Sequence, residues 1–305
     1  MYYKKMFDNI KIFILFKYYL KNKKWEELKL LLDNNEDFLE YQNKNSFRPI
    51  HYICRDGTPE MIKYIIDKGV NLEVRNKNGW KPIHLICRNS TPEMIKYIID
   101  KGVNLEDFSI NKWSPIHIIC RYSTPEMIKY IIDKGVNLEV STKENYRPIH
   151  ILCQFGPPEM IKYIIDKGVN LEVSTIEDYR PIHLICQFGT CDMIKYMIDK
   201  GVNLEAKTKY GFTPINLICQ YGSLDMIKYM INKTLEYNQK TYEHKSEIND
   251  CLITKSFKYI KNFILENEKL SEENKNDILY NYYCNKSNGI LNRFFNSNQN
   301  IYYKI

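Results

Sequence analysis

Five histidines each stand three residues before a cysteine, a spacing that could place two metal ligands on one face of a helix. The pairs are His51–Cys54, His84–Cys87, His117–Cys120, His150–Cys153 and His183–Cys186. A tetrahedral zinc site needs four ligands within about 2.3 Å. Each segment supplies two, and neighbouring helices pack about 8–10 Å apart. We therefore expect no metal site, and a structural role for both residue types.

The sequence contains no arrangement typical of a catalytic site. It has no phosphate-binding Gly-x-x-x-x-Gly-Lys loop, no Gly-x-Ser-x-Gly turn and no His-Glu-x-x-His helix. His244 is the one histidine outside the repeated pattern, and we interpret it as a surface residue. We expect a protein that is not an enzyme, with no cofactor and no small-molecule substrate.

The histidines recur because most of the chain is repetitive. The segment Pro-Ile-His begins at Pro49, Pro82, Pro115, Pro148 and Pro181, and Pro-Ile-Asn begins at Pro214, always in steps of 33 residues. A period of this length is typical of stacked-repeat proteins.

One unit, residues 76–108, predicts a turn, a short helix, a longer helix and a loop. An Asn-Gly turn signal begins at Asn78, and Pro82 suits the first turn of a helix. Thr91 is a suitable N-cap for the second helix, whose buried stripe we expect at Ile95, Ile98 and Ile99. Neither helix can cover its apolar face alone, so the units must stack.

This unit resembles the ankyrin repeat. The segment Gly-Trp-Lys-Pro-Ile-His-Leu from Gly79 is similar to the family's Gly-x-Thr-Pro-Leu-His-x, and Lys-Gly-Val-Asn from Lys101 is similar to its loop. The resemblance implies an all-α ankyrin-repeat solenoid of stacked helix-turn-helix units with short β-hairpin-like loops. It also implies that each histidine hydrogen-bonds backbone between units and that each cysteine fills a small buried position.

The phase of the repeat divides the chain into three segments. We expect an N-terminal basic segment and a degenerate capping repeat over residues 1–42, with a helix at Trp25–Asp33. Six clear repeats cover residues 43–233, and two degenerate repeats over residues 234–305 form a C-terminal cap. End units face water on one side, so they depart from the internal pattern.

Two polar positions also repeat. In four of the six units the family's Thr before the proline is replaced by a residue without a capping oxygen, at a cost of about 1 kcal/mol per helix; these residues are Arg48, Lys81, Arg147 and Arg180. The second helices carry outward lysines at Lys63, Lys96, Lys129, Lys162, Lys195 and Lys228. We interpret these lysines as a solubility face, on which Lys96 pairs weakly with Asp100.

Aromatic and arginine side chains are the candidates for partner contact. An aromatic residue precedes the cap position in every clear unit, and the end of the first helix carries Arg in three units and Gln with an aromatic residue in the other three. Since Trp, Tyr and Arg are favoured in interfaces, we expect contacts at Trp80, Trp113, Tyr146, Tyr179, Arg88, Arg121, Phe155 and Phe188. Packing between units and drift on a solvated face are the alternatives.

The resemblance implies a non-enzymatic scaffold or adaptor that binds a protein partner along the concave and hairpin face of the array. The alternative is association with an anionic membrane or a nucleic acid through residues 1–24, which carry seven lysines and one aspartate in a chain of net charge +7. Ile12, Phe13 and Leu15 could supply an apolar face there. Because the repeat array itself is close to neutral, we do not expect it to bind nucleic acid along a basic surface.

The positions of the cysteines and the hydropathy of the chain indicate the cellular compartment of the protein. Six of the nine cysteines share one repeat position, which is unlike a disulfide framework, and no stretch is apolar enough for a membrane-spanning helix. We expect a monomer in a reducing compartment, the cytoplasm or alternatively the nucleus.

Overall fold

A computed structural model describes residues 2–221 together with 226, 229, 230 and 233. The chain divides into two compact units, Met1–Asn170 and Leu171–Ile305. Every regular element within the described residues is a helix, so the all-α repeat solenoid expected from the sequence is confirmed. The two degenerate repeats expected over residues 234–305, with His244, lie outside the described residues.

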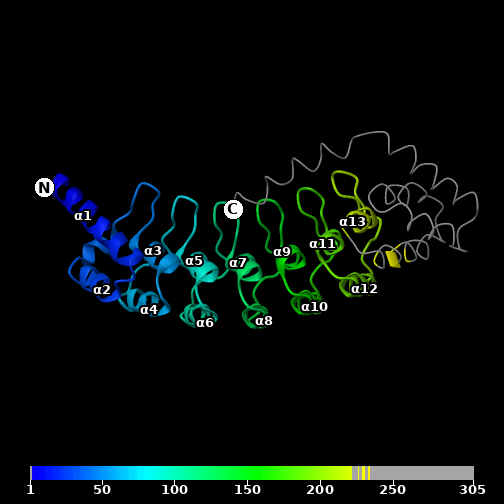
Figure 1. The fold of residues 1–305 in the computed structure, drawn as a ribbon, viewed down its shortest axis with the longest axis horizontal. Coiled ribbons are helices and arrows are strands. Elements are labelled where there is room, and N and C mark those ends of the chain that lie inside the picture. Colours follow the sequence, from blue (N-terminus) through cyan, green and yellow to red (C-terminus); the bar gives the residue numbers. More distant parts are fainter. Residues whose placement is uncertain (1, 222–225, 227–228, 231–232, 234–305) are drawn as a thin grey trace, which may run out of the picture. The chain divides into compact units, whose positions relative to one another are not determined.

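The first unit begins with three single elements and continues with four helix pairs. The single elements are α1 (Tyr2–Lys21), α2 (Trp25–Asp33) and the 3-10 helix η1 (Glu36–Glu40). The pairs are α3 (Pro49–Asp56) with α4 (Pro59–Asp67), α5 (Pro82–Asn89) with α6 (Pro92–Asp100), α7 (Pro115–Tyr122) with α8 (Pro125–Asp133), and α9 (Pro148–Phe155) with α10 (Pro158–Asp166). In Figure 1, α3, α5, α7 and α9 form one row, their partners form a second row, and the loops project beside the first row.

The second unit contains α11 (Pro181–Phe188), α12 (Cys191–Asp199) and α13 (Pro214–Tyr221) among its described residues. Its first helices α11 and α13 pack against each other, as neighbouring first helices do in the first unit. The same 33-residue unit therefore builds both parts of the chain.

In five of the six described units, the first helix is capped by a histidine. In α5, Nδ1 of His84 accepts a hydrogen bond from the backbone N–H of Lys81 at 3.1 Å, and His117 does the same for Ser114 at 3.2 Å. This is the reciprocal half of a capping box. Lys81 itself supplies no capping oxygen, so the predicted loss of that contact is confirmed, but one N–H of the helix start is still satisfied.

The second helix of most units is capped by threonine, as the sequence predicts. In α6, Oγ1 of Thr91 accepts a hydrogen bond from the N–H of Met94 at 3.3 Å. The buried face consists of Met94, Ile95 and Ile98. Ile99, expected in this stripe, is half-buried, so the face is rotated by one position toward the start of the helix.

Helices α1 and α2 cover the ends of the two helix rows, because α1 contacts α3, and the hydroxyl of Tyr64 on α4 donates to the carbonyl of Lys29 on α2 at 3.4 Å. The helix expected at Trp25–Asp33 is confirmed as α2. Phe16 of α1 is fully buried, and the ring of Phe13 lies 5.6 Å from that of Tyr52 on α3. Phe13, a candidate for membrane contact, is therefore part of the packing of this end.

Backbone hydrogen bonds connect successive projecting loops. Within one loop, the N–H of Asn76 donates to the carbonyl of Trp80 at 3.0 Å. Between loops, Lys77 N–H donates to Asn45 O at 3.0 Å and Ile110 N–H donates to Asn78 O at 2.9 Å. The loops therefore stack in register with the helices that they connect.

Candidate functional site

The repeated histidines are structural hydrogen-bonding groups. Nε2 of His84 lies 3.2 Å from the carbonyl of Trp113, and Nε2 of His117 lies 3.0 Å from that of Tyr146, each in the following repeat. This confirms the interpretation that these rings bond backbone between units. Burial lowers the pKa of both histidines to about 4. Because Nδ1 accepts a backbone N–H, the neutral ring carries its proton on Nε2 and donates it.

The repeated cysteines fill buried positions, as expected. They are Cys54, Cys87, Cys120, Cys153 and Cys186, and burial raises the pKa of each thiol well above its ordinary value. Thiols in such surroundings are inert as nucleophiles and poor as metal ligands. Among the described residues, no group of three or more His, Cys, Asp or Glu side chains could hold a metal ion.

The aromatic residues before the cap position pack on the histidines. The ring of Trp80 lies 5.7 Å from that of His84, and the ring of Tyr146 lies 5.9 Å from that of His150. Trp80, Tyr146 and Tyr179 are half-buried. Trp113 differs, because only 7% of it is exposed. We correct our expectation for Trp113, which has little ring surface to offer a partner.

A continuous strip of stacked cations and rings runs along the ends of α5, α7 and α9. The Arg88 guanidinium lies 5.8 Å from the ring of Trp80 and 5.3 Å from that of Tyr122. The Arg121 guanidinium lies 5.4 Å from the Tyr122 ring and 4.4 Å from that of Phe155. We name these five residues the arginine–aromatic strip.

The strip carries positive charge that no carboxylate of the described residues neutralises. Every other described arginine forms an ion pair: Arg48 with Glu40, Arg55 with Asp56, Arg75 with Asp107, Arg147 with Glu139 and Arg180 with Glu172. No such pair is found for Arg88 or Arg121 within the described part of the chain. Tyr122 and Phe155 are each 43% exposed, so the strip is open to a partner.

Tyr122 is a residue of this strip that the sequence analysis did not select as a contact. The signal was present, because Tyr122 directly follows Arg121 at the variable end of the first helix. Phe155 and Phe188, which hold the same position in the next two repeats, were expected as contacts, whereas Tyr122 was not. Tyr122 holds the centre of the strip, since its ring lies between both guanidinium groups.

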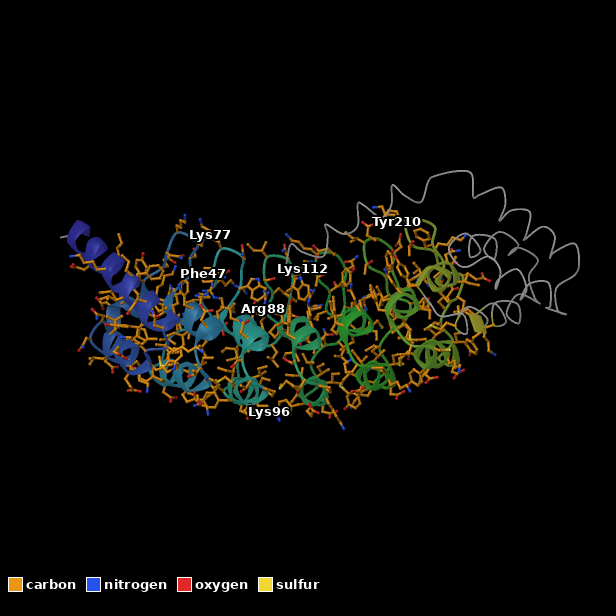
Figure 2. The ribbon with its side chains drawn as sticks, viewed as in Figure 1. Phe47, Lys77, Arg88, Lys96, Lys112 and Tyr210 are labelled. Atoms are coloured by element: carbon orange, nitrogen blue, oxygen red, sulfur yellow. The ribbon has the colours of Figure 1, made fainter. Side chains whose placement is uncertain are left out.

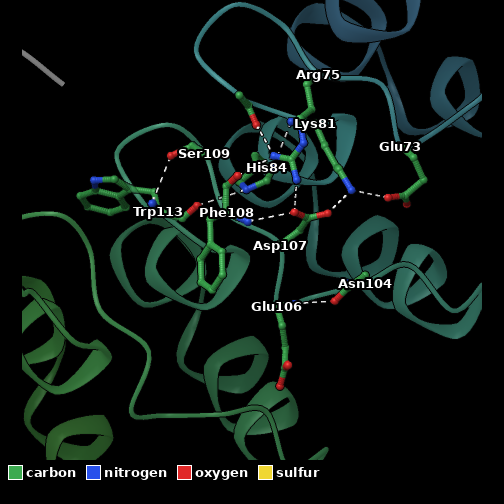
Figure 3. A network of polar contacts seen from close by, with 11 residues as sticks. Glu73, Arg75, Lys81, His84, Asn104, Glu106, Asp107, Phe108, Ser109 and Trp113 are labelled. Carbon is green, nitrogen blue, oxygen red and sulfur yellow. Dashed lines mark hydrogen bonds and ion pairs between the residues drawn. The ribbon is translucent and has the colours of Figure 1, made fainter.

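Lys81 and Arg75 form ion pairs in a network that joins two repeats (Figure 3). Asp107 forms ion pairs with both cations, and Lys81 also pairs with Glu73. Lys81 is buried, so its charge is compensated inside the protein. Figure 2 places Arg88 on the first helix row and Lys77 and Lys112 on the projecting loops.

In the second unit, Phe188 and Tyr221 are exposed at the ends of α11 and α13. Tyr179 lies over His183, with ring centroids 6.0 Å apart. Phe188 is thus accessible, as an expected contact should be. Like Trp80, Tyr179 therefore contacts the histidine of its own repeat, here edge to face.

The lysines of the second helices link repeats. Lys63 Nζ lies 5.3 Å from the ring of Tyr97, and Lys96 Nζ lies 5.2 Å from the ring of Tyr130. The hydroxyl of Tyr130 also donates to Asp100 at 3.4 Å. This corrects the expected Lys96–Asp100 pair, since both residues contact Tyr130 of the next repeat instead. The solubility role of these lysines stays a prediction.

Comparison of the sequence with models of protein families shows to which family the chain belongs. The family model for ankyrin repeats (3 copies) matches residues 17–109, 102–175 and 170–241. The chain belongs to the ankyrin repeat family. A comparison with curated proteins finds no match.

Solved structures agree on the fold. The human ASB11 ankyrin repeat domain is similar with a TM-score of 0.57 and 17% identity over 66% of this chain and 90% of that one. The ankyrin repeat domain of Bcl-3, an IkappaB family member, has a TM-score of 0.54 and 14% identity over 71% and 97%. A chain from the complex of the Bdellovibrio bacteriovorus predatory endopeptidase Bd0816 with immunity protein Bd3460 has a TM-score of 0.54 and 18% identity over 63% and 100%.

Proposed function

We propose that the chain is a non-enzymatic scaffold whose arginine–aromatic strip holds an acidic segment of a partner protein. Ankyrin repeats generally mediate protein–protein interactions. The observation that carries the finer proposal is that Arg88 and Arg121, alone among the described arginines, face rings and no carboxylate.

Ring stacking prepares these guanidinium groups for a carboxylate. A guanidinium that lies over an aromatic face keeps its N–H donors at the edge, where they can bind a carboxylate in a bidentate manner. Stacking against Tyr122 and Phe155 also restricts the side chains before binding. Less rotamer freedom is then lost in the complex, which favours affinity.

The exposed rings add an apolar contribution between the charges. Tyr122 and Phe155 offer flat surfaces of the kind that dominates the energy of protein interfaces. The partner that fits has Asp or Glu side chains alternating with apolar or aromatic ones. Charge provides the specificity and the rings provide most of the affinity.

The test is selection of binding segments from a random peptide library against the intact chain. The enriched peptides should be acidic and contain apolar residues. Arg88→Glu with Arg121→Glu should weaken their binding about tenfold or more, equivalent to about 1.4 kcal/mol, as measured by fluorescence anisotropy.

The matched control is Lys77→Glu with Lys143→Glu, which makes the same charge change at two exposed loop residues. Peptide binding to this control should stay within a factor of about three once salt screens the long-range field. Selected peptides without acidic residues, or equal loss in both variants, would contradict the proposal.

A further inference from the structure

Helix α1 has an apolar face that its own packing leaves uncovered. One side of the helix is buried through Phe16 and Leu20. The opposite side exposes Ile10, Ile14 and Tyr18, spaced four residues apart, with Leu15 beside them. Ile14 is 62% exposed. We name these four residues the outer face of α1.

Lysines surround the outer face. Residues 8–24 carry five lysines and one aspartate. Lys24 lies 3.7 Å from Glu27, and Lys17 lies over the ring of Phe13 at 5.0 Å. No ion pair is found for Lys11, Lys21 or Lys23 within the described residues. The outer face is thus apolar, and positive charge borders it.

We infer that the outer face of α1 lies on an anionic lipid surface, with its apolar residues in the acyl boundary and its lysines at the headgroups. An amphipathic helix in the plane of the interface combines these features. Tyr18 suits the boundary because its ring is apolar and its hydroxyl is polar. In this arrangement the lysines extend toward the headgroups while their methylene stems stay on the apolar side.

The charge pattern favours a membrane over a second copy of the chain. Two outer faces packed together would bring the unpaired lysines of both copies close, and like charges repel. An anionic bilayer offers the complementary charge, and each lysine near such a surface raises binding about fivefold. The N-terminal part of α1 also extends beyond α2 and α3, so a flat surface could reach it (Figure 1).

This role differs from that of the buried side of the helix. Phe13, named in the sequence analysis as an apolar contact, packs against the rings of Phe38 and Tyr52. The helix can therefore lie on lipid without leaving its place in the first unit. None of the described helices is long and apolar enough to cross a bilayer.

The experiment is sedimentation of the intact chain with vesicles of phosphatidylcholine containing phosphatidylserine, and with vesicles of phosphatidylcholine alone. The chain should sediment with the first and not with the second. Ile10→Asp with Ile14→Asp should lower the partition coefficient about tenfold or more. Lys11→Glu with Lys21→Glu should lower it by at least as much, and raised salt should weaken binding of the unchanged chain.

Leu30→Asp is the matched control, because Leu30 of α2 is also 62% exposed and lies off the outer face. It should bind vesicles as the unchanged chain does, and circular dichroism should show that every variant is folded. Four outcomes would overturn the inference: no binding of the intact chain to anionic vesicles, equal loss in Leu30→Asp, single-stranded RNA binding that alone responds to the α1 variants, or a dimer in sedimentation velocity that Ile14→Asp dissociates.

Discussion

At the scale of the residue, one loop position adopts a left-handed backbone in every repeat although it is often not glycine. The occupants are Ser46, Gly79, Lys112, Asn145, Asp178 and Gly211, with φ between 56° and 82°. Asn and Asp tolerate this region, but a lysine is strained there by roughly 1–2 kcal/mol. The Asn-Gly signal at Asn78 predicted the turn in one repeat only. In the other repeats the same backbone hydrogen bond closes the loop, as from the N–H of Lys112 to the carbonyl of Ser109 at 2.9 Å.

Lys112→Gly should therefore stabilise the protein. Glycine adopts the positive φ without strain, while it adds some freedom to the unfolded chain. We expect a net gain of about 1 kcal/mol, or roughly 2–4 °C in the melting temperature. Thermal unfolding followed by circular dichroism measures the change.

Two glycine-to-alanine variants provide the control. Gly102→Ala meets no atom within 4 Å at a φ of 79°, so it should lose about 1 kcal/mol through backbone strain alone. In Gly79→Ala the added Cβ would lie 2.7 Å from the backbone nitrogen of Ile110, so the loss should be larger. A melting temperature lowered by Lys112→Gly would contradict the strain argument.

At the scale of the element, helix boundaries could be predicted and contacts between units could not. Proline and threonine in the first turns fix where α5 and α6 begin, since both act on their own chain segment. The contact of Lys96 with Tyr130 joins residues 34 apart. It depends on how far apart the helices stack, and no local pattern contains that distance. The arginine–aromatic strip escaped full prediction for the same reason.

Asp107 illustrates the same limit. It occupies the position that holds Val74, Val140 and Val173 in other repeats. The sequence analysis did not select it, because a single aspartate in a loop is unremarkable. In the structure it pairs with Lys81, which is only 8% exposed in its side chain. A departure from the repeat at Asp107 is thus compensated by a second departure, Lys81, in the same unit.

Asp107→Val should destabilise the protein although it restores the common residue. The variant leaves the buried ammonium group of Lys81 with Glu73 alone, and breaking a buried pair costs about 3 kcal/mol. Lys81→Thr with Asp107→Val should recover most of this loss, because Thr precedes the proline at Thr213 without such a network. Urea unfolding of both single variants and the double variant measures the coupling between these residues. Additive losses would contradict the network.

At the scale of the whole molecule, the sequence predicts the order of the repeats. It does not predict how the surface chemistry differs from one repeat to the next. Six clear repeats share one sequence pattern, so the stacking of neighbouring repeats within each unit follows from the 33-residue period. The distribution of surface charge along the chain follows from differences between repeats at single positions. Arg88 and Arg121 stand where later repeats have glutamine, and Glu40 or Glu139 pairs with an arginine that replaces threonine. Surface chemistry therefore varies along the chain while the core stays constant.

Because the same histidine is buried in several repeats, each of these repeats contributes to the pH dependence of the free energy of unfolding. Burial lowers the pKa of His84, His117 and His183 to about 4, against 6.5 for an ordinary histidine. The folded state therefore binds fewer protons than the unfolded state between these values. The stability from each neutral ring is complete above about pH 6.5 and is lost as the pH falls toward 4.

The free energy of unfolding should therefore fall between pH 7.5 and pH 5.0, by about 2 kcal/mol for each of these histidines. The chain supplies its own test variant, because residues 213–216 read Thr-Pro-Ile-Asn and Asn216 Oδ1 accepts the N–H of Thr213 at 2.8 Å. Ser114→Thr with His117→Asn transfers this pattern to α7. In urea unfolding, the variant should lose about 2 kcal/mol less than the unchanged chain over the same pH interval. An unchanged pH dependence would show that His117 keeps its ordinary proton affinity in the folded state, and that the carboxylates control acid unfolding.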